Sequence, residues 1–101
     1  MPTKITIVYD NPTDPAAFEA DYPASLDLAR KLPGLERVES AKVWPKEDGT
    51  ETPAYRTLDL YFADYDAASA AVAGPEAAEF FPTVFALGEA GLTALFSDIE
   101  Q

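Results

Sequence analysis

Alternating and β-branched hydrophobic residues mark four predicted strands along the chain. In the first of these, Ile5, Ile7 and Tyr9 recur at every second position and therefore share one face. In the third, Leu58, Leu60 and Phe62 share one face, and Tyr55, Thr57, Asp59 and Tyr61 share the other. The strands are expected over residues 3–9, 36–45, 54–63 and 92–99. A helical C-terminus is the rival interpretation of the last segment.

A first helix is expected between the first two strands. Asp14 is suited to cap its N-terminus, and Pro15 fits the first helical position because proline lacks the N–H that would otherwise be unpaired there. The Pro33-Gly34 pair ends the helix. Pro23 predicts a kink or a restart, since a proline inside a helix costs about 3 kcal/mol.

A second helical region follows the third strand. Asp64 or Asp66 can cap a helix that ends at Gly74, and Pro75 begins a further helical stretch that Pro82 is expected to interrupt. The resulting order is β-α-β-β-α-β. This order predicts one α+β domain over residues 1–101, with a ferredoxin-like antiparallel sheet and helices on one of its faces.

The charge balance excludes several classes of partner. Seven Lys and Arg stand against 18 Asp and Glu, which gives a formal net charge of −11. Such a surface repels phosphate, so we expect no nucleic-acid or membrane partner. The N-terminus does not look like a signal peptide and no run has the length of a membrane helix, so a cytoplasmic protein is expected.

The chain contains neither cysteine nor histidine. Thiolate chemistry is therefore excluded, and so is the side chain best suited to proton transfer near neutral pH. Acidic pairs such as Glu36/Glu39 and Asp64/Asp66 lack the spacing of a calcium loop. We expect no metal and no cofactor.

Two segments resemble the first helix of the EthD-like proteins, named for ethyl tert-butyl ether degradation. They are Asp14-Pro15-Ala16-Ala17-Phe18 and Leu28-Ala29-Arg30-Lys31-Leu32-Pro33-Gly34-Leu35; the later Ala73-Gly74-Pro75-Glu76 resembles the start of a further family helix. The resemblance implies a dimeric α+β barrel. It also implies an accessory role beside an oxidising system, within a superfamily that includes cofactor-free monooxygenases and polyketide-processing enzymes.

The chain departs from this family at two positions of the first helix. Ser25 stands where the family histidine would fall, and Asp27 stands where the family proline would fall. Any activity that needs the histidine is therefore unavailable. Ser25 itself has no histidine to activate it as a nucleophile, and a polar helix residue is its simpler interpretation.

Large residues on both faces of the third strand predict a homodimer formed through the sheet. The dimer-interface candidates are Trp44, Tyr55, Asp59 and Tyr61. The alternative role for Asp59 and the tyrosines is that of an acid or base beside a substrate.

A pocket for a small apolar ligand is expected between the sheet and the helices. Its candidate residues are Tyr22, Ser25, Phe80 and Phe85, with Ser25 bordering the cavity. Core packing is the alternative for the phenylalanines. We expect an accessory or binding protein for a small apolar compound and assign no catalytic residue. A cofactor-free oxygenase or polyketide-processing enzyme that uses Tyr or Asp, and a purely structural dimer, are the alternatives.

Overall fold

A four-stranded antiparallel sheet in the order β2-β3-β1-β4 forms one layer of the molecule. The computed structural model describes residues 1–101. The strands are β1 Thr3–Tyr9, β2 Arg37–Lys42, β3 Arg56–Phe62 and β4 Leu92–Asp98. The predicted ferredoxin-like fold is confirmed, and the last segment is a strand rather than a helix.

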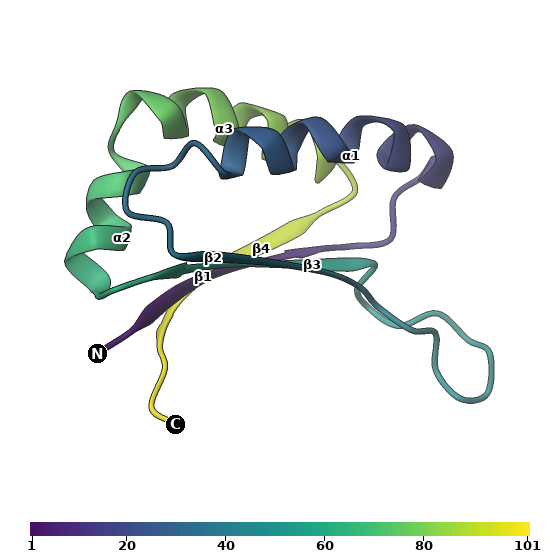
Figure 1. Ribbon diagram of the computed structural model, residues 1–101. Helices are drawn as coiled ribbons and strands as arrows, with labels where there is room; N and C mark the ends of the chain where they lie inside the picture. The colour runs from purple at the N-terminus through teal and green to yellow at the C-terminus, as the bar shows by residue number, and fades with distance from the viewer.

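Three helices lie on one side of this sheet and leave its other face open (Figure 1). They are α1 Pro15–Ala29, α2 Tyr65–Val72 and α3 Pro75–Leu87. Asp14 caps α1 by accepting a hydrogen bond from the Ala17 backbone N–H at 3.1 Å, as its position before Pro15 predicts. None of these helices has the length and apolar character that a membrane crossing requires.

Neither internal proline breaks its helix. α1 continues through Pro23 and α3 continues through Pro82, so the predictions of a restart and of an interruption are wrong. Each proline removes only one main-chain hydrogen bond from its helix. The buried side chains before and after it, such as Phe80 and Val84 around Pro82, hold the two halves of α3 against the core.

Strand register sorts the side chains onto the two faces of the sheet. Ile5 of β1 pairs with Leu60 of β3, and all three helix-facing apolar residues of β3 are buried. The core joins residues of β1, β3 and the helical layer; its largest fully buried apolar side chains are Tyr9, Phe62, Phe80, Ile5, Ile7, Leu58, Leu60 and Val84. Full burial of each such side chain contributes about 1.5–3 kcal/mol, which makes this layer the main source of stability.

The segment between β2 and β3 is a long loop rather than the ends of two strands. β2 ends at Lys42 and β3 begins at Arg56, so the predicted strand limits of 45 and 54 are wrong. The loop extends away from the body of the sheet (Figure 1). Gly49, at its tip, has a φ of 85°, a conformation that glycine adopts at little cost.

Candidate functional site

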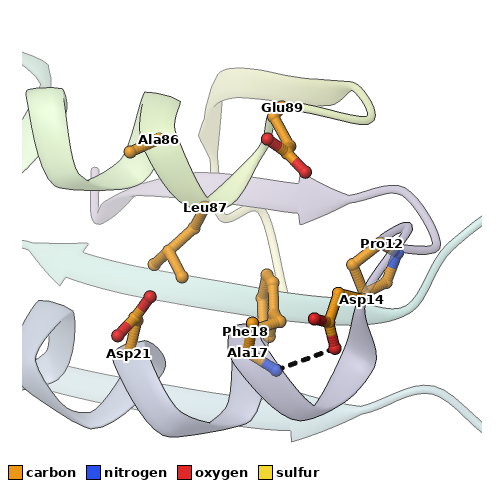
Figure 2. Close-up of a pocket in the computed structure, with 8 residues that line it drawn as sticks. All are labelled: Pro12, Asp14, Ala17, Phe18, Asp21, Ala86, Leu87 and Glu89. Atoms are coloured by element: carbon orange, nitrogen blue, oxygen red, sulfur yellow. Dashed lines mark hydrogen bonds between the residues drawn. The ribbon is translucent and has the colours of Figure 1, made fainter.

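A half-enclosed hollow of about 140 Å³ lies between the first turns of α1 and the end of α3 (Figure 2). Its apolar lining residues are Pro12, Ala17, Phe18, Ala86 and Leu87, and its acidic ones are Asp14, Asp21 and Glu89. A shallower groove continues along the same helix seam and shares Asp21, Ala86 and Leu87 with it. Small alanine side chains at the seam leave this space between the two helices.

The three carboxylates around the hollow have different surroundings. Asp14 is engaged as the cap of α1, and Glu89 accepts a hydrogen bond from the Thr13 hydroxyl at 3.0 Å. Figure 2 shows the Asp21 carboxylate facing Leu87, which points from α3 toward α1. Asp21 is therefore the carboxylate that remains available to a bound molecule.

Phe18 separates the hollow from a cluster of tyrosine rings inside the molecule. Its ring centroid lies 5.2 Å from that of Tyr9 in an edge-to-face contact and 5.4 Å from that of Tyr22 in a stacked contact. Tyr55 also meets Phe18 edge to face, with centroids 5.2 Å apart. Such geometries are favourable for aromatic pairs, so Phe18 is packed on one side and faces the hollow on the other.

The hydroxyl of Tyr9 is buried without a hydrogen-bond partner in the chain. The residue is 0% exposed, and its Oη is the one fully buried side-chain polar atom that finds no donor or acceptor. Burial raises the pKa of Tyr9, and the neighbouring Tyr22 phenol raises it further. Tyr9 therefore presents a neutral O–H group inside the molecule.

Tyr22 differs from Tyr9 in being hydrogen-bonded. Its hydroxyl lies 2.7 Å from the Ser40 Oγ of β2. Burial raises the pKa of Tyr22, although the hydrogen bond to Ser40 and the nearby Arg56 guanidinium oppose this effect. Both buried phenols thus stay protonated at neutral pH.

An ion pair borders the tyrosine cluster on the side of β2 and β3. The Arg56 guanidinium lies 4.5 Å from the centre of the Tyr22 ring and donates to both carboxylate oxygens of Glu19. These hydrogen bonds hold the pKa of Glu19 below its usual range. The pair joins α1 to β3 and keeps Tyr22 in place.

The predicted pocket residues do not line the hollow. Tyr22, Ser25 and Phe80 are buried in the core, whereas Phe85 is 61% exposed on the outer side of α3. The placement of Phe85 inside a pocket is therefore wrong, because its neighbours Val84 and Leu87 occupy the inward positions of that helix turn. Ser25 is fully buried, donates to the Tyr22 carbonyl at 2.6 Å and does not line the hollow.

Two of the four interface candidates lie on the open face of the sheet. Asp59 accepts a hydrogen bond from the Thr6 hydroxyl and lies 3.6 Å from the Lys4 Nζ. The Tyr61 hydroxyl donates to Glu39, the residue of β2 that pairs with Asp59. These side chains form a hydrogen-bonded polar surface that a second sheet can cover.

The other two candidates lie elsewhere. Tyr55 precedes β3 and turns its ring toward Phe18 on the helix side, so the prediction that it shares a face with Asp59 and Tyr61 is wrong. Trp44 lies beyond the end of β2 and is 85% exposed. In both cases the strand ends earlier than the alternation suggests, and the side chain no longer follows the alternation of the sheet.

Sequence reasoning missed the residues that shape the hollow. Phe18 belongs to the segment that resembles the first helix of the EthD-like proteins, but nothing in the sequence pairs it with Leu87, 69 positions later. Tyr9 was placed on the inner face of β1, and no local pattern shows that its hydroxyl lacks a partner. Both features depend on the packing of distant elements.

Comparison with solved structures identifies the class of protein. An ethyl tert-butyl ether (EthD) family protein from Bacillus halodurans superposes with a TM-score of 0.91 at 22% identity, covering 98% of this chain and 99% of the other. A dimeric ferredoxin-like protein of unknown function from Jannaschia superposes with a TM-score of 0.71 at 19% identity, covering 98% of this chain and 100% of the other. SnoaB, a cofactor-independent oxygenase from Streptomyces nogalater, superposes with a TM-score of 0.67 at 20% identity, covering 99% of this chain and 93% of the other. The chain is a ferredoxin-like α+β protein with the EthD fold.

Comparison of sequences, rather than of structures, relates the chain to a smaller group of proteins. No protein-family model matches the chain. It is 35% identical over 98 residues to the uncharacterized 11.0 kDa protein in the thcB-thcC intergenic region of Rhodococcus erythropolis, covering 96% of this chain and 94% of that protein. The chain belongs to the family of this Rhodococcus protein. The predicted resemblance to EthD-like proteins is confirmed for the fold.

Proposed function

We propose that the protein is a cytoplasmic homodimer that binds a small apolar molecule in the hollow between α1 and α3, as an accessory of an oxidative degradation system. The observation that carries the proposal is the hollow itself, with Phe18 and Leu87 as its apolar walls and a volume of about 140 Å³. An apolar cavity of about 150 Å³ accommodates a benzene-sized molecule. A compound of that size can pack against these apolar side chains, while the open side of the hollow leaves part of its surface in water.

The open face of the sheet supports the dimer. Leu95 is 50% exposed on this face, beside the hydrogen-bonded groups of Asp59 and Tyr61. A mixed apolar and polar surface of this kind is typical of an interface between subunits. The Jannaschia protein with the same fold is described as dimeric, which agrees with the proposal.

The enzymatic alternative needs a base that the tyrosines do not supply. The raised pKa values of Tyr9 and Tyr22 keep both phenols protonated at neutral pH, so neither can accept a proton from a substrate there. Asp59 lies on the sheet face opposite the helices, far from the hollow's lining. Asp21 is the one carboxylate positioned for such a role, and the fold that this chain shares with SnoaB keeps the alternative worth testing.

Binding is tested by titrating the isotopically labelled protein with benzene and following backbone amide shifts by NMR. We expect the largest shifts at residues around Phe18 and Leu87, with saturation at one site. Ala86→Leu adds side-chain volume to the wall of the hollow and should abolish these shifts. Ala78→Leu, at an exposed position of the same helix outside the hollow, is the matched control and should preserve them.

Unchanged spectra at saturating benzene, or equal binding by wild type and Ala86→Leu, would show that the hollow is not a ligand site. Asp21→Asn separates binding from catalysis, because it keeps the apolar walls and removes the carboxylate. An accessory protein retains its affinity in this variant. Selective loss of a measured turnover would favour the enzymatic alternative.

A further inference from the structure

The charged side chains on the open face of the sheet form two rows that run across the strands. The basic row places an aromatic ring between two cations, and the strand register sets its members side by side: Arg37 of β2, Tyr61 of β3 and Lys4 of β1. The acidic row lies two positions away on each of these strands and consists of Glu39 of β2, Asp59 of β3 and Thr6 of β1. Opposite charges are therefore separated along the strands rather than mixed over the face.

Contacts within the chain hold these side chains on the open face. The Arg37 guanidinium lies 4.2 Å from the centre of the Tyr61 ring, and the Tyr61 hydroxyl donates to Glu39. The Lys4 Nζ lies 3.6 Å from the Asp59 carboxylate. Arg37 and Glu39 are also 3.4 Å apart, but their side chains remain 61% and 51% exposed. Each of these two groups thus has room for a second partner of opposite charge.

The strands contribute no net charge to the open face of a strongly acidic protein. Their outward residues supply two cations and two carboxylates, whereas the whole chain has a formal net charge of −11. Two copies of such a chain repel each other over much of their surfaces. Equal numbers of both signs remove this repulsion at the open face. They also make the face complementary to itself, as a two-fold symmetric interface between identical chains requires.

The order of the two rows selects one of two symmetric ways to stack the sheets. When the strands of two facing sheets align, the two-fold axis between the sheets runs either along the strands or across them. An axis along the strands sets each row against the same row of the partner, so that like charges face each other. An axis across the strands, passing between the two rows, sets the basic row against the partner's acidic row. Only this second arrangement pairs opposite charges.

We propose that two copies of the chain pack through their open sheet faces with their strands running in opposite directions, so that Arg37 lies against the partner's Glu39 and Tyr61 lies against the partner's Asp59. This inference rests on the proposed function, which includes a homodimer. It adds the register of the two sheets and the residues that fix it.

Charge reversal tests this register, with the dissociation constant of the dimer measured by sedimentation equilibrium. Arg37→Glu and Glu39→Arg each set like charges against each other in two symmetry-related contacts, so we expect either variant to raise the dissociation constant by at least about tenfold. An equimolar mixture of the two variants should form a heterodimer with near wild-type affinity, because an acidic pair then faces a basic pair. Native mass spectrometry distinguishes this heterodimer from the two homodimers by mass.

The matched controls are Arg30→Glu and Asp27→Arg, which make the same changes of net charge at an exposed ion pair near the end of α1. Because both residues lie on the helical side of the sheet, neither substitution should change the dissociation constant. Equal weakening by the controls would show that the dimer responds to net charge alone, and the register would be overturned.

The remaining outcomes separate the register from the dimer itself. If wild type is a monomer, the proposed homodimer fails and the inference fails with it. If wild type is a dimer and only one of the two open-face substitutions weakens it, the basic row does not face the partner's acidic row and the register alone is wrong. The same conclusion follows if neither substitution has an effect, or if mixing the two variants restores no dimer.

Discussion

Arg56 and Glu19 form a two-pronged hydrogen-bonded ion pair, with Nε and Nη2 of the arginine donating to the two carboxylate oxygens at 3.0 and 2.8 Å. Residues 37 positions apart thereby tie β3 to α1. The Arg56 side chain is only 17% exposed, whereas Glu19 is 36% exposed, so the pair is partly screened by solvent. The same guanidinium covers the Tyr22 ring and so bounds the aromatic cluster.

Arg56→Met should destabilise the protein by about 1–3 kcal/mol, because it breaks both hydrogen bonds and leaves Glu19 with only the longer contact to the Lys42 Nζ at 3.9 Å. The free energy of unfolding in urea measures this change. The matched control is Arg30→Met, which removes an exposed ion pair to Asp27 and should change stability by less than about 0.5 kcal/mol. Equal effects of the two substitutions would show that the Arg56–Glu19 pair contributes no more than an ordinary surface contact.

The same pair predicts a specific acid dependence. Hydrogen bonds from Arg56 lower the pKa of Glu19 below its ordinary value of 4.5, so the folded state favours the ionised carboxylate. This contribution is present above pH 4.5 and is lost as pH falls through the lower folded-state pKa. Glu19→Gln should flatten the decline of stability in that range, as measured by urea unfolding at several pH values. An unchanged slope would contradict the assignment.

Ser25 is expected to tolerate a smaller side chain but not a larger one. Ser25→Ala loses one hydrogen bond to the Tyr22 carbonyl and should cost about 1 kcal/mol. Ser25→His forces an imidazole into a fully buried site and should cost at least about 3 kcal/mol through overpacking and burial of a polar ring. Thermal unfolding of both variants checks this order. A stable Ser25→His protein would show that the core beneath α1 can open into the cavity that the sequence predicted.

Substitution on the open sheet face should dissociate the proposed dimer. Leu95→Glu introduces a charge on that face, where burial against a second subunit disfavours it. Phe85→Glu, at a similarly exposed apolar position on α3, is the matched control because it lies on the helical side. We expect sedimentation equilibrium to give a dimer for wild type and Phe85→Glu and a monomer for Leu95→Glu. Dissociation by Phe85→Glu alone would place the interface on the helices.

Local sequence patterns predicted the elements correctly because strands and helix caps depend on neighbouring residues. The limits of β1 at 3 and 9 match the structure, as does the start of α1 after Asp14. The breaks predicted at Pro23 and Pro82 are absent, because packing of the flanking helix turns outweighs the loss of one main-chain hydrogen bond. The alternation also failed at Tyr55, just before β3, where the main chain still bonds to Tyr9 and Val43 but the ring packs against Phe18 of α1.

The sequence by itself determined the order of elements and the inward faces of β1 and β3, since side-chain periodicity alone sets them. Only the tertiary structure decided that Phe18 and Leu87 enclose a hollow, that Phe85 lies outside it, and that the Tyr9 hydroxyl has no partner. These features depend on how α1 and α3 pack over the sheet. Helix packing brings together residues far apart in the chain, and no local pattern records which of them meet.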